Sequence, residues 1–485
     1  KIQDPFTMIR TLGLLSILLL GYMTSFAQNK EVLYDFQEIP QAIMVNPGIN
    51  TIYNWYAGIP FISGIYAKGA TSGLTVNDIF AADGLDINQK VRDRALNSLS
   101  ERDEVNGIFQ VDVLSGGFRS QKNPANFFSF GMYIEGYALN YWPKDLAILA
   151  YEGNADRLGQ RFDLNDLNAS GQFINVLHFG INRQIKNNLT LGARIKLYSG
   201  ILDIKSTNNS GYFETTLGDN NLLRNTLVSD MRLRTSGLDA LFDANDNGSS
   251  VAGLFTKRGL FGGDPGLGFD LGVTYNLNDQ TVITGSLLDI GLLYHTSDVT
   301  NYTLKGSASI EGVEIILPDA LNDPNADVWE DLVNEIEELV PFEENNNNYV
   351  SFRPIKFYSS IRYNFGKQGE PVADCDCDYK PNSGDRSLYY LNSVGAQLYA
   401  INRPRGPQFA LTAFYQRRFA KVLALKATYT VDKFTPTNVG LGMSLQAGPV
   451  NFYIMGDNLF SYGNIADSNY ASFQLGLNII SWERN

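Results

Sequence analysis

Two short segments of the sequence carry residue types that could bind a metal or form a covalent bond. Asp243, Asn245 and Asn247 place side-chain oxygens at alternate positions before Gly248, as in the first half of a calcium-binding loop. The final position of such a loop needs a bidentate glutamate, and here that position is Leu254. A hydrated surface turn is therefore the default interpretation and calcium the alternative. We predict no cofactor and no resident metal.

The only cysteines, Cys375 and Cys377, lie in the run Asp374-Cys375-Asp376-Cys377-Asp378. Two cysteines are too few for a disulfide framework, and they lack the four-ligand spacing of a structural zinc site. In an oxidising compartment an intramolecular bridge is the favoured state. A cross-link to a partner, two free thiols, and a metal site that includes the flanking aspartates are the alternatives.

The sequence offers no motif for catalysis. His178 and His295 are the only histidines, and neither lies in a motif with a nearby serine or cysteine nucleophile and a carboxylate. We therefore predict that the protein is not an enzyme. The net charge of -13 also argues against nucleic acid as a partner.

Alternation of apolar and polar residues dominates the C-terminal part of the chain. Val439, Leu441, Met443 and Leu445 alternate with glycine, serine and glutamine, and the last such segment ends at Trp482. Successive side chains on a strand point to opposite faces, so each segment has one apolar and one polar face. Segments of about ten residues with this pattern, joined by short turns, are typical of a transmembrane β-barrel. The sequence therefore predicts an all-β, antiparallel barrel in the outer membrane.

The pattern predicts about fourteen strands, an even number as single-chain bacterial barrels require. Residues 206–235 could hold one further hairpin, and the segments 85–99 and 327–340 have helical spacing. The predicted strands are 52–68, 105–119, 127–140, 172–183, 189–199, 267–277, 281–290, 352–365, 388–401, 408–418, 422–432, 438–447, 450–458 and 470–482.

Connections in a barrel alternate between the two sides of the membrane. The tight turns at 185–188, 278–280 and 447–449 fall on one side, which short turns identify as periplasmic. The long connections at 71–103, 141–170, 200–265 and 291–350 all fall on the other, extracellular side. The segment 366–386 is the exception, because it is long and yet periplasmic by this count.

The N-terminal region predicts export and then a segment that precedes the first strand. Arg10, the apolar run 12–20 and the small-residue exit Ser25-Phe26-Ala27 have the layout of a cleaved signal peptide over 8–27. Residues 1–7 are interpreted as a vector-derived remnant or an upstream extension. Residues 28–50 contain the turn Asn46-Pro47-Gly48, which fits a plug folded back into the lumen. Residues 51–485 are assigned to the barrel.

Charged residues of both signs fall on the polar phase of the predicted strands and should face the lumen. A salt-bridged interior is the ordinary content of such a barrel, so this interpretation is favoured over a catalytic one. The residues concerned are His178, Arg194, Lys196, Asp270, Arg362, Lys426 and Asp432.

Several segments between about residues 33 and 482 are similar to an uncharacterised family of outer-membrane barrels from Bacteroidetes. The similar segments are Leu33-Tyr34-Asp35-Phe36, Asn46-Pro47-Gly48, Trp55-Tyr56-Ala57-Gly58-Ile59-Pro60, Tyr429-Thr430, Asn438-Val439-Gly440-Leu441-Gly442, and Tyr453 through Asp457-Asn458. That family resembles the PorP/SprF barrels of type nine secretion and gliding and, more distantly, FadL-type transporters with an N-terminal hatch and fourteen strands. The present hatch reads Asn-Pro-Gly where the transporters usually read Asn-Pro-Ala, and the 291–350 connection is large.

The resemblance implies a non-enzymatic scaffold or anchor associated with type nine secretion or cell-surface machinery. Its partners would be a secreted adhesin or a secretion-system component, besides membrane lipid and lipopolysaccharide. The alternative is a FadL-like passive transporter of hydrophobic or small solutes. A soluble carbohydrate-binding or adhesin module is a third hypothesis, and such a module would be recovered without detergent.

Overall fold

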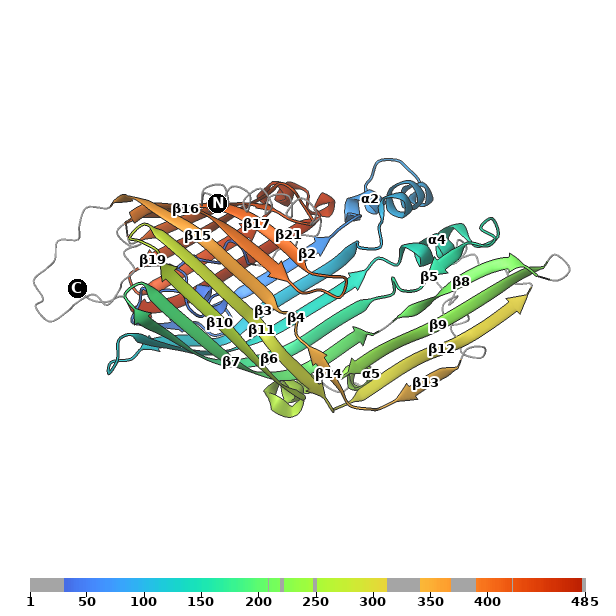
Figure 1. Ribbon diagram of the computed structural model, residues 1–485, viewed down its shortest axis with the longest axis horizontal. Coiled ribbons are helices and arrows are strands. Elements are labelled where there is room, and N and C mark those ends of the chain that lie inside the picture. The colour runs from blue at the N-terminus through green and yellow to red at the C-terminus, as the bar shows by residue number, and fades with distance from the viewer. Residues whose placement is uncertain are drawn as a thin grey trace, which may run out of the picture.

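Residues that alternate between apolar and polar side chains form the wall of a closed β-barrel in the computed structural model (Figure 1). The structure describes residues 30–207, 209–218, 222–246, 251–311, 341–367, 390–420 and 422–481. Fourteen antiparallel strands make up the ring, so the predicted fold class is confirmed. The predicted signal peptide and the predicted helix over 327–340 lie outside the described residues.

The ring closes because the last strand pairs with both parts of the first. The first strand is β1 (Trp55–Gly58) with β2 (Ile65–Thr71), and the last is β21 (Tyr470–Ser481). Between them lie, in chain order, β3 (Glu104–Arg119), β4 (Asn126–Tyr141), β6 (Ala169–Lys186), β7 (Leu189–Ser206), β10 (Asp264–Asn276), β11 (Thr281–His295), β14 (Tyr349–Phe352) continued by β15 (Lys356–Lys367), β16 (Tyr390–Ile401), β17 (Gln408–Phe419), β18 (Leu423–Val431), β19 (Asn438–Ala447) and β20 (Val450–Asp457).

The first strand is interrupted, where the sequence predicts one continuous strand over 52–68. Residues 59–64 separate β1 from β2. Pro60 has no N–H to donate to a ladder, and Phe61 adopts a φ of 64°, which a strand cannot contain. Alternation alone could not reveal this break, because the apolar residues Ile59, Phe61 and Ile62 continue the strand-like composition.

The sheet of the wall extends beyond one end of the barrel, on the right of Figure 1, through the pairing of β9 with β7. This extension consists of β8 (Ser210–Leu217), β9 (Leu223–Ser236), β12 (Val299–Glu311) and β13 (Phe342–Asn345), with β5 (Arg161–Asp163) paired to β8. The hairpin predicted within 206–235 is confirmed as β8 and β9. β12 lies in a predicted loop instead, because both of its faces are partly exposed and its sequence lacks a continuous apolar phase.

Helical segments lie in the long connections of the extracellular end. The helix predicted within 85–99 is confirmed as α3 (Ile87–Lys90) continued by η2 (Val91–Leu96). None of the helices in the described part of the chain has the length and apolar character needed to cross a membrane. The other segments are α2 (Val76–Phe80), α4 (Lys144–Glu152), α5 (Leu238–Asp246), α6 (Val251–Lys257), η4 (Arg258–Gly262), η6 (Leu459–Gly463) and η7 (Ile465–Asp467).

The two faces of the wall differ in exposure as the alternation predicts. On β10, Leu267, Phe269 and Leu271 are 40%, 45% and 51% exposed, whereas the intervening Asp270 is fully buried. In a closed ring, each wall strand forms its backbone hydrogen bonds with its two neighbouring strands. The apolar outer face is suited to contact with the hydrocarbon of a bilayer. The protein is therefore an outer-membrane barrel.

Candidate functional site

Residues 30–54, here called the luminal segment, lie inside the ring of strands. The segment contains η1 (Pro40–Met44), and residues 31–49 are almost all buried. Its contacts come from strands all around the ring: Arg362 of β15 pairs with Asp35, and Asn478 of β21 accepts a hydrogen bond from Gln41. Asn182 of β6 donates to the carbonyl of Pro47. A segment that contacts the inward face of so many strands must cross the lumen.

The turn Asn46-Pro47-Gly48 lies against a part of the wall that has no side chains. Gly192 of β7 and Gly272 of β10 are cross-strand partners. A Cβ atom at Gly192 would lie 2.0 Å from the carbonyl oxygen of Pro47, and one at Gly272 would lie 2.2 Å from Oδ1 of Asn46. This glycine pair therefore forms a notch that accepts the turn, and any side chain there would displace it.

Hydrogen bonds from the wall fix the luminal segment on both sides of this notch. Asn182 Nδ2 donates to the carbonyls of Pro47 and Ile49 at 2.7 and 2.8 Å. Ser286 Oγ of β11 donates to the carbonyl of Val45 at 2.6 Å. These carbonyls lie in an irregular segment and have no ladder partner, so the wall side chains satisfy them.

Three of the cations predicted to face the lumen bind the luminal segment. Arg362 Nη1 lies 2.8 Å from Asp35 Oδ1, with both side chains 1% exposed. Lys426 donates to the carbonyl of Tyr34, and Arg194 donates to the carbonyls of Met44 and Ile43. The predicted inward orientation of these side chains agrees with the structure. They bind the luminal segment as well as opposite charges on the wall.

A second network of buried charges lies farther toward the extracellular end. Lys196 Nζ lies 2.9 Å from Asp270 and 2.5 Å from Asp289, and Lys356 Nζ lies 2.8 Å from Asp289. Sequence reasoning singled out Lys196 and Asp270 but missed Asp289. The available signal was a single charge inside the apolar run from Leu287 to Leu293. The network continues to Arg353 and Glu135, which form a buried ion pair.

Three residues far apart in the chain form a hydrogen-bonded chain of aspartate, histidine and serine. His295 Nδ1 lies 2.9 Å from Asp264 Oδ2, and His295 Nε2 lies 2.7 Å from Ser351 Oγ. The order of atoms is that of a hydrolase triad. However, all three side chains are at most 1% exposed, and Gln172 Nε2 also donates to Ser351 Oγ at 2.9 Å. A substrate carbonyl has no access to this oxygen, so the chain of bonds is structural.

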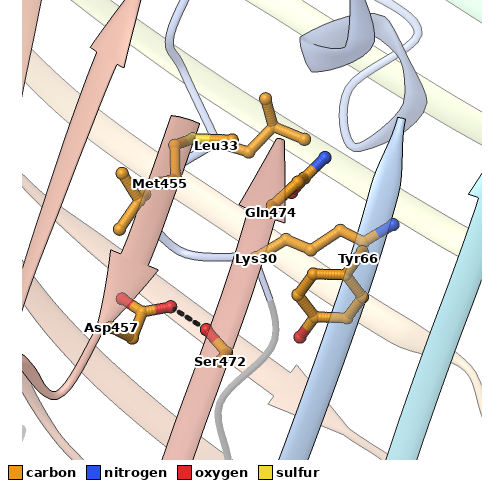
Figure 2. Close-up of a pocket in the computed structure, with 8 residues that line it drawn as sticks. Lys30, Leu33, Tyr66, Met455, Asp457, Ser472 and Gln474 are labelled. Carbon is orange, nitrogen blue, oxygen red and sulfur yellow. Dashed lines mark hydrogen bonds between the residues drawn. The ribbon is translucent and has the colours of Figure 1, made fainter. Parts of the chain in front are cut away.

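A small cavity lies where the luminal segment begins (Figure 2). Its empty volume is about 180 Å³, with room for only a water-sized group. Lys30 crosses it above the ring of Tyr66, with Nζ 4.9 Å from the ring centroid, and donates to Gln110. On the other side Ser472 Oγ donates to Asp457 at 2.6 Å, as Figure 2 shows. Side chains of both charge signs line the cavity together with the apolar Val32, Leu33 and Met455.

The connection after β18 is held by hydrogen bonds to Asp432 and by an ion pair to β3. Asp432 Oδ1 accepts hydrogen bonds from the backbone N–H groups of Phe434 and Thr435, each at 2.7 Å. Burial raises the pKa of Asp432 to about 7, although these two N–H groups and Lys68 act in the opposite direction. Lys433 Nζ lies 2.9 Å from Glu104, so the connection is tied to β3.

The candidate calcium loop overlaps the C-terminal end of a helix, where the sequence predicts a surface turn. Asp243 and Asn245 belong to the last residues of α5, and Asn247 lies outside the described residues. Among the residues that the structure describes, no three histidine, cysteine, aspartate or glutamate side chains are grouped to hold a metal ion. Calcium binding at this segment stays a prediction.

The cysteines and His178 are the other residues that the sequence singled out. Cys375 and Cys377 lie outside the described residues, so their bridge stays a prediction. His178 is 2% exposed on the inward face, and its ring packs beside Tyr133 with centroids 5.9 Å apart. It is a packed core histidine.

Comparison with known proteins identifies a family and several barrels of similar extent. The model of a family of unknown function (DUF5723) matches residues 47–457. None of the curated proteins matches the chain. Among solved structures, the P. putida toluene transporter TodX is 10% identical with a TM-score of 0.34, and the alignment covers 96% of each chain.

Two further structures are similar at the same level. The Ralstonia pickettii toluene transporter TbuX is 11% identical with a TM-score of 0.37, over 91% of this chain and 92% of that one. A Pseudomonas aeruginosa FadL homologue is 10% identical with a TM-score of 0.41, over 94% of this chain and 97% of that one. The function of the present chain has to follow from its own residues.

Proposed function

The chain belongs to the family of unknown function DUF5723, and from the residues of its lumen we propose that it is a passive channel for small solutes. The channel opens when the luminal segment moves. The observation that carries this proposal is the seating of the turn Asn46-Pro47-Gly48 in the notch of Gly192 and Gly272. The turn is held there by hydrogen bonds and close packing, which are reversible.

The size of the ring supports a channel over a simple anchor. A barrel of about eight strands is filled by its own side chains, and a larger ring encloses more space. Here fourteen strands surround a lumen that a separate stretch of chain fills. A protein that served only as a membrane anchor would require neither this wide ring nor the luminal segment inside it.

The polarity of the lumen bears on the solute. Charged side chains of both signs line the extracellular half, among them Lys196, Asp289, Glu135 and Arg353. A hydrocarbon would have to pass these groups without satisfying them, whereas a small polar solute can exchange hydrogen bonds with them. Within the class of hydrophobic or small solutes, the lumen therefore favours small polar ones.

Conductance of the full-length protein in planar bilayers tests the proposal. Gly272→Val places a side chain where Asn46 lies, so we expect its conductance to exceed that of the parent protein severalfold. Gly285→Val is the matched control: Gly285 lies on the neighbouring strand β11, and a Cβ there meets only ordinary contacts, the nearest at 3.5 Å. Equal, low conductance of all three proteins, with the luminal segment of Gly272→Val accessible to protease, would refute the channel.

A scaffold for type nine secretion or cell-surface machinery is the second candidate. The observation that favours it is the sheet of β8, β9, β12 and β13, which extends beyond the barrel wall (Figure 1). Exposed connections held by a rigid wall are where binding concentrates. Pull-down of the tagged protein from native outer membranes of secreting cells should recover an adhesin or a secretion component. Recovery of the barrel alone would count against this role.

A further inference from the structure

Two polar side chains lie on the outward face of the wall, where lipid is expected. Asn175 of β6 and Ser199 of β7 are cross-strand partners, and the next pair on the same face is Leu177 and Leu197. Leu197 is 37% exposed, as a lipid-facing residue should be, but Asn175 and Ser199 are only 4% and 1% exposed. Unsatisfied polar groups are costly in hydrocarbon. Another part of the chain must therefore cover this pair.

Residues 251–262, comprising α6 and η4 and here called the outer turn, cover the pair. Asn175 Nδ2 donates to the carbonyl of Gly259 at 2.7 Å, and Ser199 Oγ donates to the carbonyl of Arg258 at 2.6 Å. The ring of Phe255 packs on the outward-facing ring of Phe173, with centroids 5.2 Å apart. The outer turn therefore lies on the outside of the barrel, where Figure 1 shows a yellow-green coil below β6 and β7.

The side of the outer turn that faces away from the barrel is apolar. Leu260 and Phe261 are 60% and 52% exposed. Phe261 has a φ of 63°, a conformation that residues other than glycine rarely adopt, and its side chain is exposed. Arg258 holds the turn in place from the other side, because its guanidinium donates to the carbonyl of Ile201 and pairs with Asp264.

The outer turn continues the lipid-facing band of the wall. Ser199 is paired with Pro265, and the next outward pair toward the periplasm is Leu197 with Leu267, which is 40% exposed. Leu260 and Phe261 therefore lie just above the apolar band, at the level where barrels carry aromatic girdles. We propose that the outer turn is an interfacial anchor, with Leu260 and Phe261 inserted among the lipids of the outer leaflet.

A second connection makes the same arrangement at another place on the outer wall. Gly456 of β20 pairs with the outward-facing Leu441, and a Cβ there would lie 3.1 Å from Tyr462 Oη of η6. Tyr462 also donates to the carbonyl of Ser472 at 2.6 Å, so η6 lies on the outer wall. Phe460 is 80% exposed on it. The outer turn covers β6 and β7 and η6 covers β20 and β21, and β4, β3 and the first strand lie between these two places in the ring, so two separate anchors set the depth of the barrel.

Site-directed spin labelling of the full-length protein tests the anchor. In a Cys375→Ser, Cys377→Ser background, nitroxides are attached at Phe261→Cys and Phe460→Cys. Leu267→Cys is the lipid reference, and Leu222→Cys, 47% exposed between β8 and β9, is the water reference. The protein is placed in phosphatidylcholine and phosphatidylglycerol vesicles, and collision rates with oxygen and with a water-soluble nickel chelate are measured.

We expect the labels at 261 and 460 to follow the lipid reference, with oxygen collisions exceeding nickel collisions severalfold. A label at 261 that behaves like the water reference would overturn the proposal. A second variant tests the attachment: Asn175→Leu with Ser199→Ala keeps the wall apolar but removes both donors. It should increase the mobility of the label at 261 and leave the label at 267 unchanged. Unchanged mobility at 261 would show that this pair does not hold the outer turn.

Discussion

Gly272 of β10 lies directly opposite Gly192 of β7, and a Cβ atom at either residue would come within 2.2 Å or less of the luminal segment. The wall and the segment are therefore complementary at backbone level. A glycine pair on one face of two adjacent strands leaves space for a turn of main chain, and the carbonyls of that turn are then satisfied by wall side chains.

Asn182→Ala should loosen the luminal segment while leaving the wall intact. The substitution removes two donors and leaves the carbonyls of Pro47 and Ile49 unsatisfied, a cost of about 1–3 kcal/mol. Hydrogen exchange of residues 45–52 should accelerate accordingly. Asn451→Ala is the control, because Asn451 is also buried and donates to Ser444 within the wall. Equal acceleration in both variants would contradict the assignment.

Arg362→Met should be strongly destabilising because it leaves the carboxylate of Asp35 buried without its cation. Breaking one side of a buried ion pair costs about 3–5 kcal/mol. The double variant Asp35→Asn, Arg362→Met should recover most of this loss, since asparagine tolerates the φ of 60° at position 35 and carries no charge. Urea unfolding in detergent micelles measures both. Additive losses in the double variant would show that the pair is not coupled.

Ser351 should fail to react with fluorophosphonate probes despite its hydrogen bond to His295. Its oxygen is buried and also accepts from Gln172, so its role is to complete a polar network. Ser351→Ala should lower the unfolding midpoint, because His295 loses a partner at 2.7 Å. Covalent labelling of the parent protein that disappears in Ser351→Ala would reverse this conclusion and indicate a hydrolase.

Asp432 should make the protein less stable as the pH rises. Its folded pKa of about 7 lies above the ordinary 3.8, so the folded state holds the proton more tightly than the unfolded chain does. Stability is complete below the ordinary value and is lost as the pH rises through the folded pKa. Asp432→Asn keeps an oxygen for Phe434 and Thr435 but stays neutral.

We therefore expect this variant to match the parent protein at pH 4 and to exceed its unfolding midpoint at pH 8. The measurement is the difference between the two proteins at each pH, which cancels the contribution of other titrating groups. A difference that is the same at both pH values would show that Asp432 keeps its ordinary pKa in the folded protein.

The period-two pattern was sufficient for the wall because it is a local property. A strand turns its side chains alternately to either face, so the phase of Arg194, Arg362 and Lys426 alone predicts that they point inward. The count of such segments then predicted an even ring, and the lengths of the connections agreed with that count. The interruption at Pro60 and Phe61 was missed because its apolar residues continue the strand-like composition, and β12 was missed because it lacks a continuous apolar phase.

The partners of these residues were decided by the tertiary structure. Asp35 and Arg362 meet across 327 residues of sequence, and Asp264, His295 and Ser351 come together only because three strands are adjacent in one register. From its composition the outer turn is only a loop between strands. It lies on the lipid-facing wall because two outward-facing polar side chains donate hydrogen bonds to its carbonyls. Local periodicity determines which face a side chain occupies; ring closure and register determine what that side chain meets there.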